Sequence, residues 1–203
     1  MWTGARVCAT VAAIARTGVA MPIRVDAYTA GGMASGLLAR SGHLRDALET
    51  SQELPLERVA WHALGETRAS PVGDVTIPVD DVLIAMTDEE PSAAVHASWH
   101  RVRLELGPYV VDGELPTLPG YDPGRALARP SGEFVLLRDV HLTPAPSEAD
   151  QGIAVPFAFV NRYGTERVLA DIMLGFFFPG AALDGLEEAS DAPVPAVPAA
   201  GPA

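Results

Sequence analysis

An internal repeat constrains the fold of this chain more than any other feature of its sequence. The segment IRVDAYTAGGMASGLL, residues 23–38, aligns with HRVRLELGPYVVDGEL, residues 100–115, at an offset of 77 positions. The offset grows along the chain and reaches 81 at Val59 and Val140, a drift that small loop insertions explain. Self-similarity of this kind predicts two related structural units in tandem.

The last part of the repeat is less regular. The segment VTIPVDDVLIAM, residues 75–86, aligns with residues 153–173, so that Pro78 falls on Pro156. The second segment contains the glycine turn YGT, residues 163–165, which lacks the strand-to-helix context of a phosphate loop. This alignment predicts that the final strands of the two copies correspond.

Apolar and polar side chains alternate within each copy. Val102, Leu104 and Leu106 alternate with arginine and glutamate, the pattern of a strand with one buried face. Gly36 and Gly113 lie inside the second predicted strand of each copy, where glycine favours a bulge or a sharp bend. The period of two therefore predicts strands, with a corner near each of these glycines.

The other predicted elements complete the same plan in both copies. Leu44–Leu48 and Arg125–Leu127 are predicted to form one short helical turn each. The remaining predicted strands are residues 54–64, 75–79, 82–86, 134–142, 153–159 and 167–172. Five short strands are enough to close a small barrel. We therefore expect an all-β protein of two tandem five-stranded barrels, each with one short helical turn.

Composition shifts suggest the domain boundaries. The predicted order is an N-terminal extension at 1–20, the first barrel at 21–88, a linker at 89–98, the second barrel at 99–180 and a disordered acidic, Pro/Ala-rich tail at 181–203. The first residues loosely resemble a secretory signal, although Arg16 interrupts the apolar stretch. An extension before a domain that starts near Met21 is the preferred interpretation.

The motifs VVDGEL, GRAL, FVLLRDVHLTP and VPFAFVN in the second copy resemble an uncharacterised bacterial family of small, Sm-like β-barrels. The first copy follows the same pattern but departs from it at Glu57-Arg58 and at Val79-Asp80. The resemblance implies a small barrel and no assigned activity. The segment VPFAFVNRYGTERVLADIMLGFF is also similar to the last barrel strands of the photosynthetic reaction-centre H subunit.

Charge and residue usage exclude several classes of function. The chain has 203 residues and a formal net charge of −12, so its field repels nucleic-acid backbones and disfavours an Sm-like RNA binder. All 14 basic residues are arginine, which excludes enzymes that need a P-loop or Schiff-base lysine. Its one cysteine, Cys8, cannot form an intramolecular disulfide, and we expect a cytoplasmic protein. No stretch reaches the roughly 18 apolar residues of a membrane span.

No group of residues forms a convincing catalytic or metal site. His96 and His100 are four residues apart, but no cysteine or acidic cluster accompanies them, so solvated histidines are the preferred reading. The adjacent carboxylates Asp80-Asp81 and Glu89-Glu90 are typical of a solvated surface. No serine lies in a Gly-x-Ser-x-Gly elbow. We therefore predict no enzymatic activity, no cofactor and no metal.

Three consecutive phenylalanines stand out after the last predicted strand. A strand buries alternate side chains on one face, so Phe176 and Phe178 are expected on one side and Phe177 on the other. At least one ring then needs another surface, either the seam between the barrels or a partner. Phe176, Phe177 and Phe178 are thus the predicted partner-docking residues.

Two functions remain open from the sequence. The first is a non-enzymatic protein-interaction module that acts as an accessory or scaffold subunit of a larger assembly, including one at a membrane surface. The second is a small-ligand or regulatory sensor that binds in the cleft between the barrels.

Overall fold

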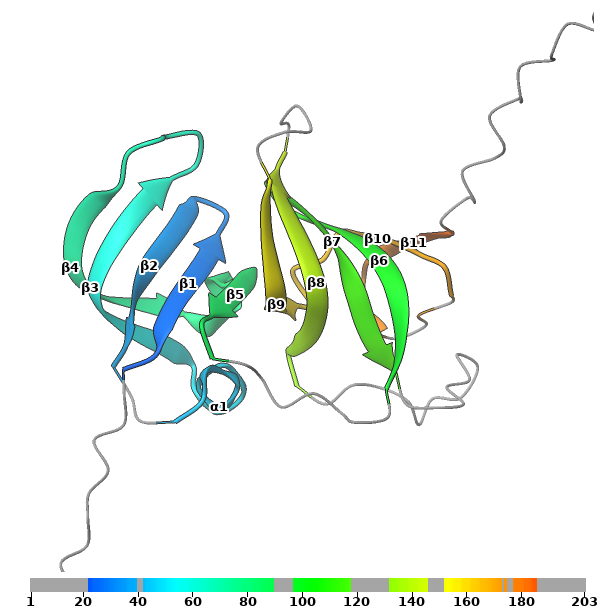
Figure 1. Ribbon diagram of the computed structural model, residues 1–203, viewed down its shortest axis with the longest axis horizontal. Helices are drawn as coiled ribbons and strands as arrows, with labels where there is room; N and C mark the ends of the chain where they lie inside the picture. The colour runs from blue at the N-terminus through cyan, green and yellow to red at the C-terminus, as the bar shows by residue number, and fades with distance from the viewer. Residues whose placement is uncertain are drawn as a thin grey trace, which may run out of the picture.

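Strands dominate the computed structural model, which describes residues 22–39, 42–89, 97–117, 132–145, 152–172, 174 and 177–185 (Figure 1). These residues contain eleven strands, one α-helix and one 3-10 turn. The prediction of a β protein is confirmed. The predicted N-terminal extension and the second helical turn at Arg125–Leu127 lie outside the described residues, as do most of the predicted linker and tail.

The elements divide into two halves of the same plan. The N-terminal half contains β1 (Arg24–Thr29), β2 (Gly32–Leu38), α1 (Leu44–Thr50), β3 (Glu53–Ala63), β4 (Ser70–Pro78), the 3-10 turn η1 (Val79–Asp81) and β5 (Ile84–Thr87). The C-terminal half contains β6 (Ser98–Leu106), β7 (Tyr109–Thr117), β8 (Phe134–Pro144), β9 (Ile153–Asn161), β10 (Arg167–Ala170) and β11 (Ala182–Gly185).

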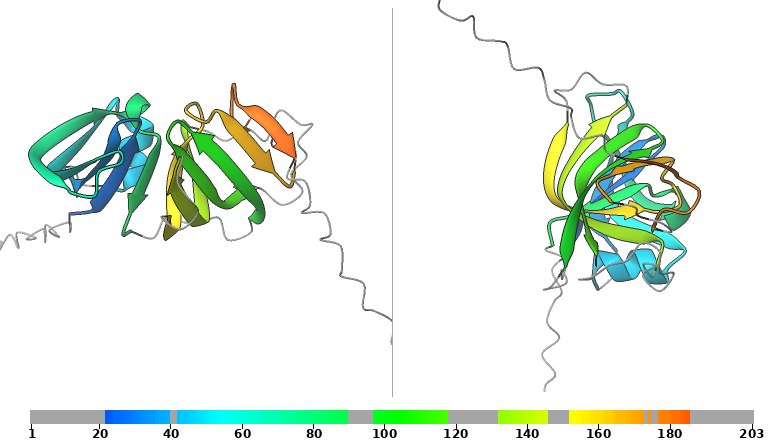
Figure 2. Two further views of the ribbon diagram at one scale, coloured as in Figure 1. Left: turned by 90° about the horizontal axis from the view of Figure 1, so that it is seen from above. Right: turned by 90° about the vertical axis from the view of Figure 1, so that its right-hand side faces the viewer.

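All eleven strands belong to one sheet. Its order is β11-β10-β6-β7-β8-β9-β5-β1-β2-β3-β4, so each half places its fifth strand beside its first. The sheet curls separately in each half, as the two views in Figure 2 show. Within the described residues, neither half closes on itself: the outer edge of β5 pairs with β9 instead of β4, and that of β10 pairs with β11 instead of β9. The prediction of two separate closed barrels therefore gives way to one continuous open sheet.

Backbone hydrogen bonds recur at equivalent places in the two halves. The amide of Val79 donates to Gln52, and that of Arg162 donates to Glu133. The same correspondence holds along the last strands, because β4 and β9 are both nine residues long and lie 83 positions apart. Pro78 therefore corresponds to Asn161, so the predicted alignment of Pro78 with Pro156 was wrong. The alignment failed because β4 begins at Ser70, five residues before the strand predicted at 75–79, whereas β9 begins at Ile153 as predicted.

A bulge lies at the predicted glycine of each second strand. The β2–β3 register shifts between Ser35 and Leu37, and the β7–β8 register shifts between Asp112 and Glu114. A Cβ atom on Gly36 would lie 2.9 Å from the carbonyl oxygen of Glu57, and one on Gly113 would lie 3.2 Å from that of Arg138. Both glycines thus allow the third strand of their half to cross closely at the bend.

Replacing Gly36 with alanine should lower the free energy of unfolding by about 1–3 kcal/mol, because backbone must move to accommodate the methyl group. Gly31 is the matched control, since a Cβ atom there would meet its nearest neighbour at 3.7 Å, an ordinary contact. Urea denaturation of the two variants tests the prediction. Equal stabilities would show that the bulge does not depend on close packing at Gly36.

Two hydrophobic cores meet and exchange residues at the β5–β9 junction. Phe134 and Phe159 of the C-terminal half pack into the core of the N-terminal half. Conversely, Tyr28 and Ile84 of the N-terminal half pack into the core of the C-terminal half. The Tyr109 hydroxyl donates to the Thr29 carbonyl at 3.0 Å, and burial raises the pKa of this phenol to about 12. The halves are therefore joined by packed side chains as well as by backbone pairing.

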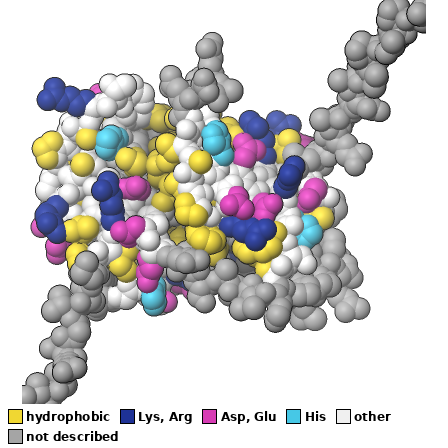
Figure 3. Space-filling model, in the orientation of Figure 1, with side chains coloured by type: hydrophobic (Ala, Val, Ile, Leu, Met, Phe, Trp, Pro, Cys, Tyr) yellow, Lys and Arg dark blue, Asp and Glu magenta, His cyan; other side chains and the backbone are white. Residues whose placement is uncertain are grey.

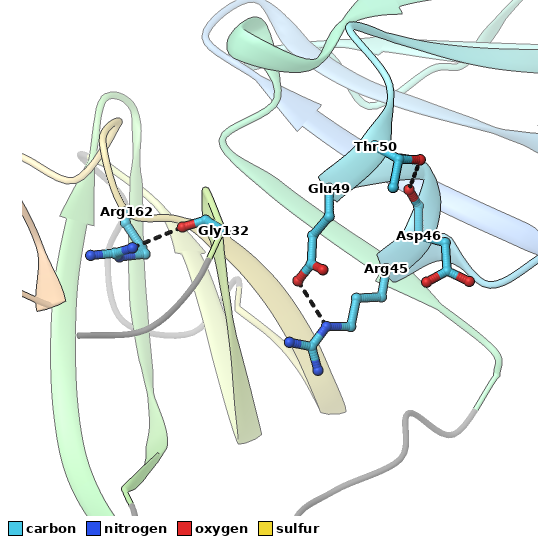
Figure 4. A network of polar contacts seen from close by, with 6 residues as sticks. All are labelled: Arg45, Asp46, Glu49, Thr50, Gly132 and Arg162. Carbon is cyan, nitrogen blue, oxygen red and sulfur yellow. Dashed lines mark hydrogen bonds and ion pairs between the residues drawn. The ribbon is translucent and has the colours of Figure 1, made fainter. Parts of the chain in front are cut away.

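Two local polar networks involve the helix and the turn after β9. Helix α1 turns Leu44, Ala47 and Leu48 into the core, and its exposed face carries the Arg45–Glu49 ion pair at 2.8 Å (Figure 4). Figure 4 also shows the buried Arg162, whose Nη1 donates to the Gly132 carbonyl at 2.8 Å. Its Nε donates to the carbonyl of Phe177. Arg162 thereby ties the last described turn to the start of β8.

Candidate functional site

A cleft opens where the two halves meet, and we call it the junction cleft. Strands β5 and β9 pair at Ile84 with Val160 and at Ala85 with Phe159, and among the described residues no further pair follows toward Thr87 and Phe157. The resulting cavity has a volume of about 520 Å³. Its lining residues are Arg24, Asp26, Met86, Thr87, Asp88, Glu89, Ile153, Val155, Pro156 and Phe157. In Figure 3, hydrophobic side chains gather along the middle of the molecule, where the halves meet.

Strand β9 supplies the apolar wall of the cleft. Ile153, Val155 and Phe157 occupy alternate positions of this strand and all line the cavity. Ile153 is 44% exposed and so presents apolar surface to the cavity. Because β9 pairs with β8 along its other edge at every position except Pro156, this wall is held in place by the ladder. The apolar surface of the cleft is therefore preformed.

Strand β1 places a carboxylate with incomplete hydrogen bonding on the opposite side. The Oδ1 atom of Asp26 is buried, and it accepts no hydrogen bond from any described residue. The nearest cation is the Nε of Arg24 at 3.9 Å, and Arg24 also donates from Nη2 to the Ser35 hydroxyl at 3.1 Å. A buried carboxylate oxygen without a donor is unfavourable by about 1–3 kcal/mol or more. A ligand that donates a hydrogen bond to Asp26 would relieve this penalty.

Other acidic side chains add to the negative character of the cleft. Asp88 and Glu89 follow β5 and line the cavity. Glu89 is already partnered, because its Oε1 lies 2.5 Å from Nδ1 of His43 and its amide donates to the Thr87 hydroxyl. Three carboxylates thus face one guanidinium. The lining suits a group that combines a positive charge with an apolar body.

The negative charge of Asp26 also affects Tyr28, a core residue beside the cleft. Burial raises the pKa of the Tyr28 phenol well above its usual range, and the nearby negative charge of Asp26 raises it further. The ring of Tyr28 meets that of Tyr109 edge to face, with centroids 5.5 Å apart. The phenols therefore remain neutral at physiological pH.

The structure places the predicted docking residues elsewhere. Phe177 is 6% exposed and Phe178 is 2% exposed, and both belong to the core of the C-terminal half. The prediction that Phe177 and Phe178 would lie on opposite sides was wrong, because this segment is a turn in which the amide of Phe177 donates to the Leu174 carbonyl. Strand alternation does not apply to a turn. Phe176 lies outside the described residues.

The other groups considered from the sequence do not assemble into a site. Asp80 and Asp81 are exposed on η1, as expected for solvated carboxylates. His100 lies 3.1 Å from the hydroxyl of Thr117, whereas His96 lies outside the described residues. Within the described ranges, no three His, Cys, Asp or Glu side chains are grouped to hold a metal ion. No helix in these ranges has the length and apolarity needed to cross a membrane.

Sequence reasoning missed the main residues of the junction cleft. The predicted site did not include Asp26, Ile153 or Phe157, because each fits an ordinary strand pattern. Pro156, one residue before Phe157, was an available signal, since proline in a strand indicates an edge that lacks a partner. Searches of family models, curated proteins and solved structures find no match to this chain.

Proposed function

We propose that the protein is a non-enzymatic protein-interaction module, an accessory or scaffold subunit of a larger assembly, and that its junction cleft receives a segment of the partner. The proposal includes an origin by tandem duplication of a small five-stranded barrel, which the repeated strand order supports. The partner segment would carry an arginine or lysine beside an apolar side chain.

The observation that carries this proposal is the Asp26 carboxylate. Its buried oxygen lacks a hydrogen-bond donor and lies in a cleft that also presents apolar side chains. A guanidinium or ammonium group would supply both the missing donor and the compensating charge, and charge-assisted hydrogen bonds are the strong ones. The apolar wall at Ile153 and Phe157 would bury the neighbouring side chain, in the manner of an interface anchor.

Photo-crosslinking in the native cells tests the proposal. A photoreactive residue at Ile153, on the cleft wall, should form an adduct with a defined protein. The same residue at Val72 is the matched control, because Val72 is 50% exposed on β4, outside the cleft. An adduct at both positions, or at neither, would argue against the cleft as a protein-docking site.

The charge requirement gives an independent check. Asp26→Asn should reduce the crosslinking yield at Ile153 about tenfold, because one charge-assisted hydrogen bond contributes about 1.5 kcal/mol or more. Glu66→Gln removes one negative charge from an exposed position that does not line the cleft and should leave the yield unchanged. Equal yields for the two variants would show that general charge, and not Asp26, attracts the partner.

A small-ligand sensor is the second candidate. The cleft volume of about 520 Å³ falls within the range of about 300–1,000 Å³ that small-molecule sites occupy. Native mass spectrometry of the protein purified from its own cells separates the two functions. A bound small cation that is lost in Asp26→Asn, without a protein adduct at Ile153, would favour the sensor.

A further inference from the structure

The internal junction shows how this chain joins one half to the next. There, β9, the fourth strand of its half, pairs antiparallel with β5, the fifth strand of the other half. Asn161 extends the contact, because its amide donates to the Leu83 carbonyl at 2.9 Å and its side-chain Nδ2 donates to the Val82 carbonyl at 3.1 Å. The junction is therefore a pairing of a fourth strand with a fifth strand.

Strand β10 has the position in the C-terminal half that β5 has in the N-terminal half. Each pairs antiparallel with the first strand of its own half. The outer edge of β10, however, is covered by β11, which runs parallel to it over Arg167–Ala170. The edge of β10 that pairs with β11 therefore corresponds to the edge of β5 that pairs with β9. Residues 182–185, at the start of the predicted disordered tail, thus form a strand, whereas residues 186–203 of that tail lie outside the described residues.

The contacts that hold β11 are few. Its pairing covers four residues, and Leu183 is 41% exposed. The ion pair between Arg167 and Asp184 is short, at 2.6 Å, but both side chains are about half exposed, and exposed ion pairs stabilise little. Ala182 donates one backbone hydrogen bond to the Glu166 carbonyl. A competing strand could therefore replace β11 without disturbing a core.

The opposite edge of the sheet is β4, the counterpart of β9. Thr76 lies opposite Pro55, whose carbonyl accepts from Ala39 on the β2 side. The amide and carbonyl of Thr76 therefore point away from β3, toward the open edge. Pro78 takes the place of Asn161 and has neither an amide proton nor a side-chain donor. The β4 edge can pair as β9 does, but with two hydrogen bonds fewer.

We propose that β11 is a cap: it covers the edge of β10 through which two chains would otherwise associate. When β11 is absent or displaced, this uncapped β10 binds β4 of a second copy of this chain, head to tail. The capped chain stays a monomer because β11 fills the edge that the second copy needs. Pro78 weakens the contact further, in agreement with the use of proline to protect sheet edges.

Two truncated chains test the cap. A chain that ends at Ala181 lacks β11, whereas a chain that ends at Gly185 keeps it and is the matched control. Light scattering after size-exclusion chromatography should show a monomer for the control and concentration-dependent oligomers for the shorter chain. Pro78→Asn in the shorter chain should lower the concentration for half-association about tenfold, because it restores the two missing donors. The same substitution in the control should have no effect.

Substitution at the other edge identifies the contact. Thr76→Pro removes an outward amide and no amide that pairs within the chain, so it should return the shorter chain to a monomer. If the shorter chain does not fold in a thermal melt, Asp184→Pro in the full chain replaces it, because this change removes both a backbone donor and the ion pair of the cap. A folded, uncapped Pro78→Asn chain that stays monomeric would overturn the proposal, as would oligomers that persist with Thr76→Pro.

Discussion

Replacing Phe178 with alanine should lower the free energy of unfolding by about 3–5 kcal/mol. The ring is only 2% exposed and is among the largest fully buried side chains of the protein. It packs in the core of the C-terminal half together with Leu174 and Phe177. Truncation would leave a cavity that the surrounding sheet cannot fill, because β-ladders on both sides fix the neighbouring strands.

Urea denaturation followed by circular dichroism measures this effect. Val72→Ala is the control, because Val72 is 50% exposed and a surface truncation should change stability by less than about 0.5 kcal/mol. A loss of that small size for Phe178→Ala would mean that the ring is not part of the core. The phenylalanine segment would then regain its predicted role in partner docking.

Replacing Asn161 with alanine should lower the free energy of unfolding by about 2–4 kcal/mol, because several backbone groups lose their partner at once. The Asn161 side chain donates to the buried carbonyl of Val82. Its Oδ1 accepts from the amides of Tyr163 and Gly164 at 2.9 Å and 3.2 Å. One amide side chain thus closes the turn after β9 and binds the other half of the protein.

The Asn161 prediction has a local as well as a global consequence. Hydrogen exchange at the β5–β9 pairs should accelerate more than exchange at the β2–β3 pairs, because the junction loses a direct contact. Pro78→Ala is the matched control at the corresponding, exposed position of the N-terminal half, and should cost less than about 1 kcal/mol. Uniform acceleration across both ladders would indicate that Asn161 supports overall stability and not the junction.

Local features were predictable from the sequence because their causes are local. Alternation of apolar side chains predicted β6 around Val102, Leu104 and Leu106, and all three are buried. The predicted corners at Gly36 and Gly113 are the two observed bulges, since only glycine leaves room for the crossing strand. The predicted helical turn at Leu44–Leu48 is α1, which continues to Thr50.

The candidate site was much less predictable than the elements around it. The junction cleft lies beyond the two pairs that β5 and β9 form, and these strands are far apart in the sequence. Asp26 is unusual only because of its surroundings in space. The sequence predicted a glycine turn at YGT, residues 163–165, but not the burial of the preceding Asn161 and Arg162, both 4% exposed. An asparagine three residues before a glycine could have indicated a side chain that caps its own turn.

The sequence by itself determined the strands, their bends and the repeated order of elements, because side-chain alternation and glycine sterics act between near neighbours. Tertiary structure decided which edges pair: β9 with β5 at the junction, and β11 with β10 at the end of the sheet. Any exposed strand edge offers the same backbone donors and acceptors, so the choice among edges depends on long-range packing and on single residues such as Asn161 and Pro78. That choice produces one open sheet instead of the two closed barrels that the sequence predicted, and it forms the cleft that we propose as the binding site.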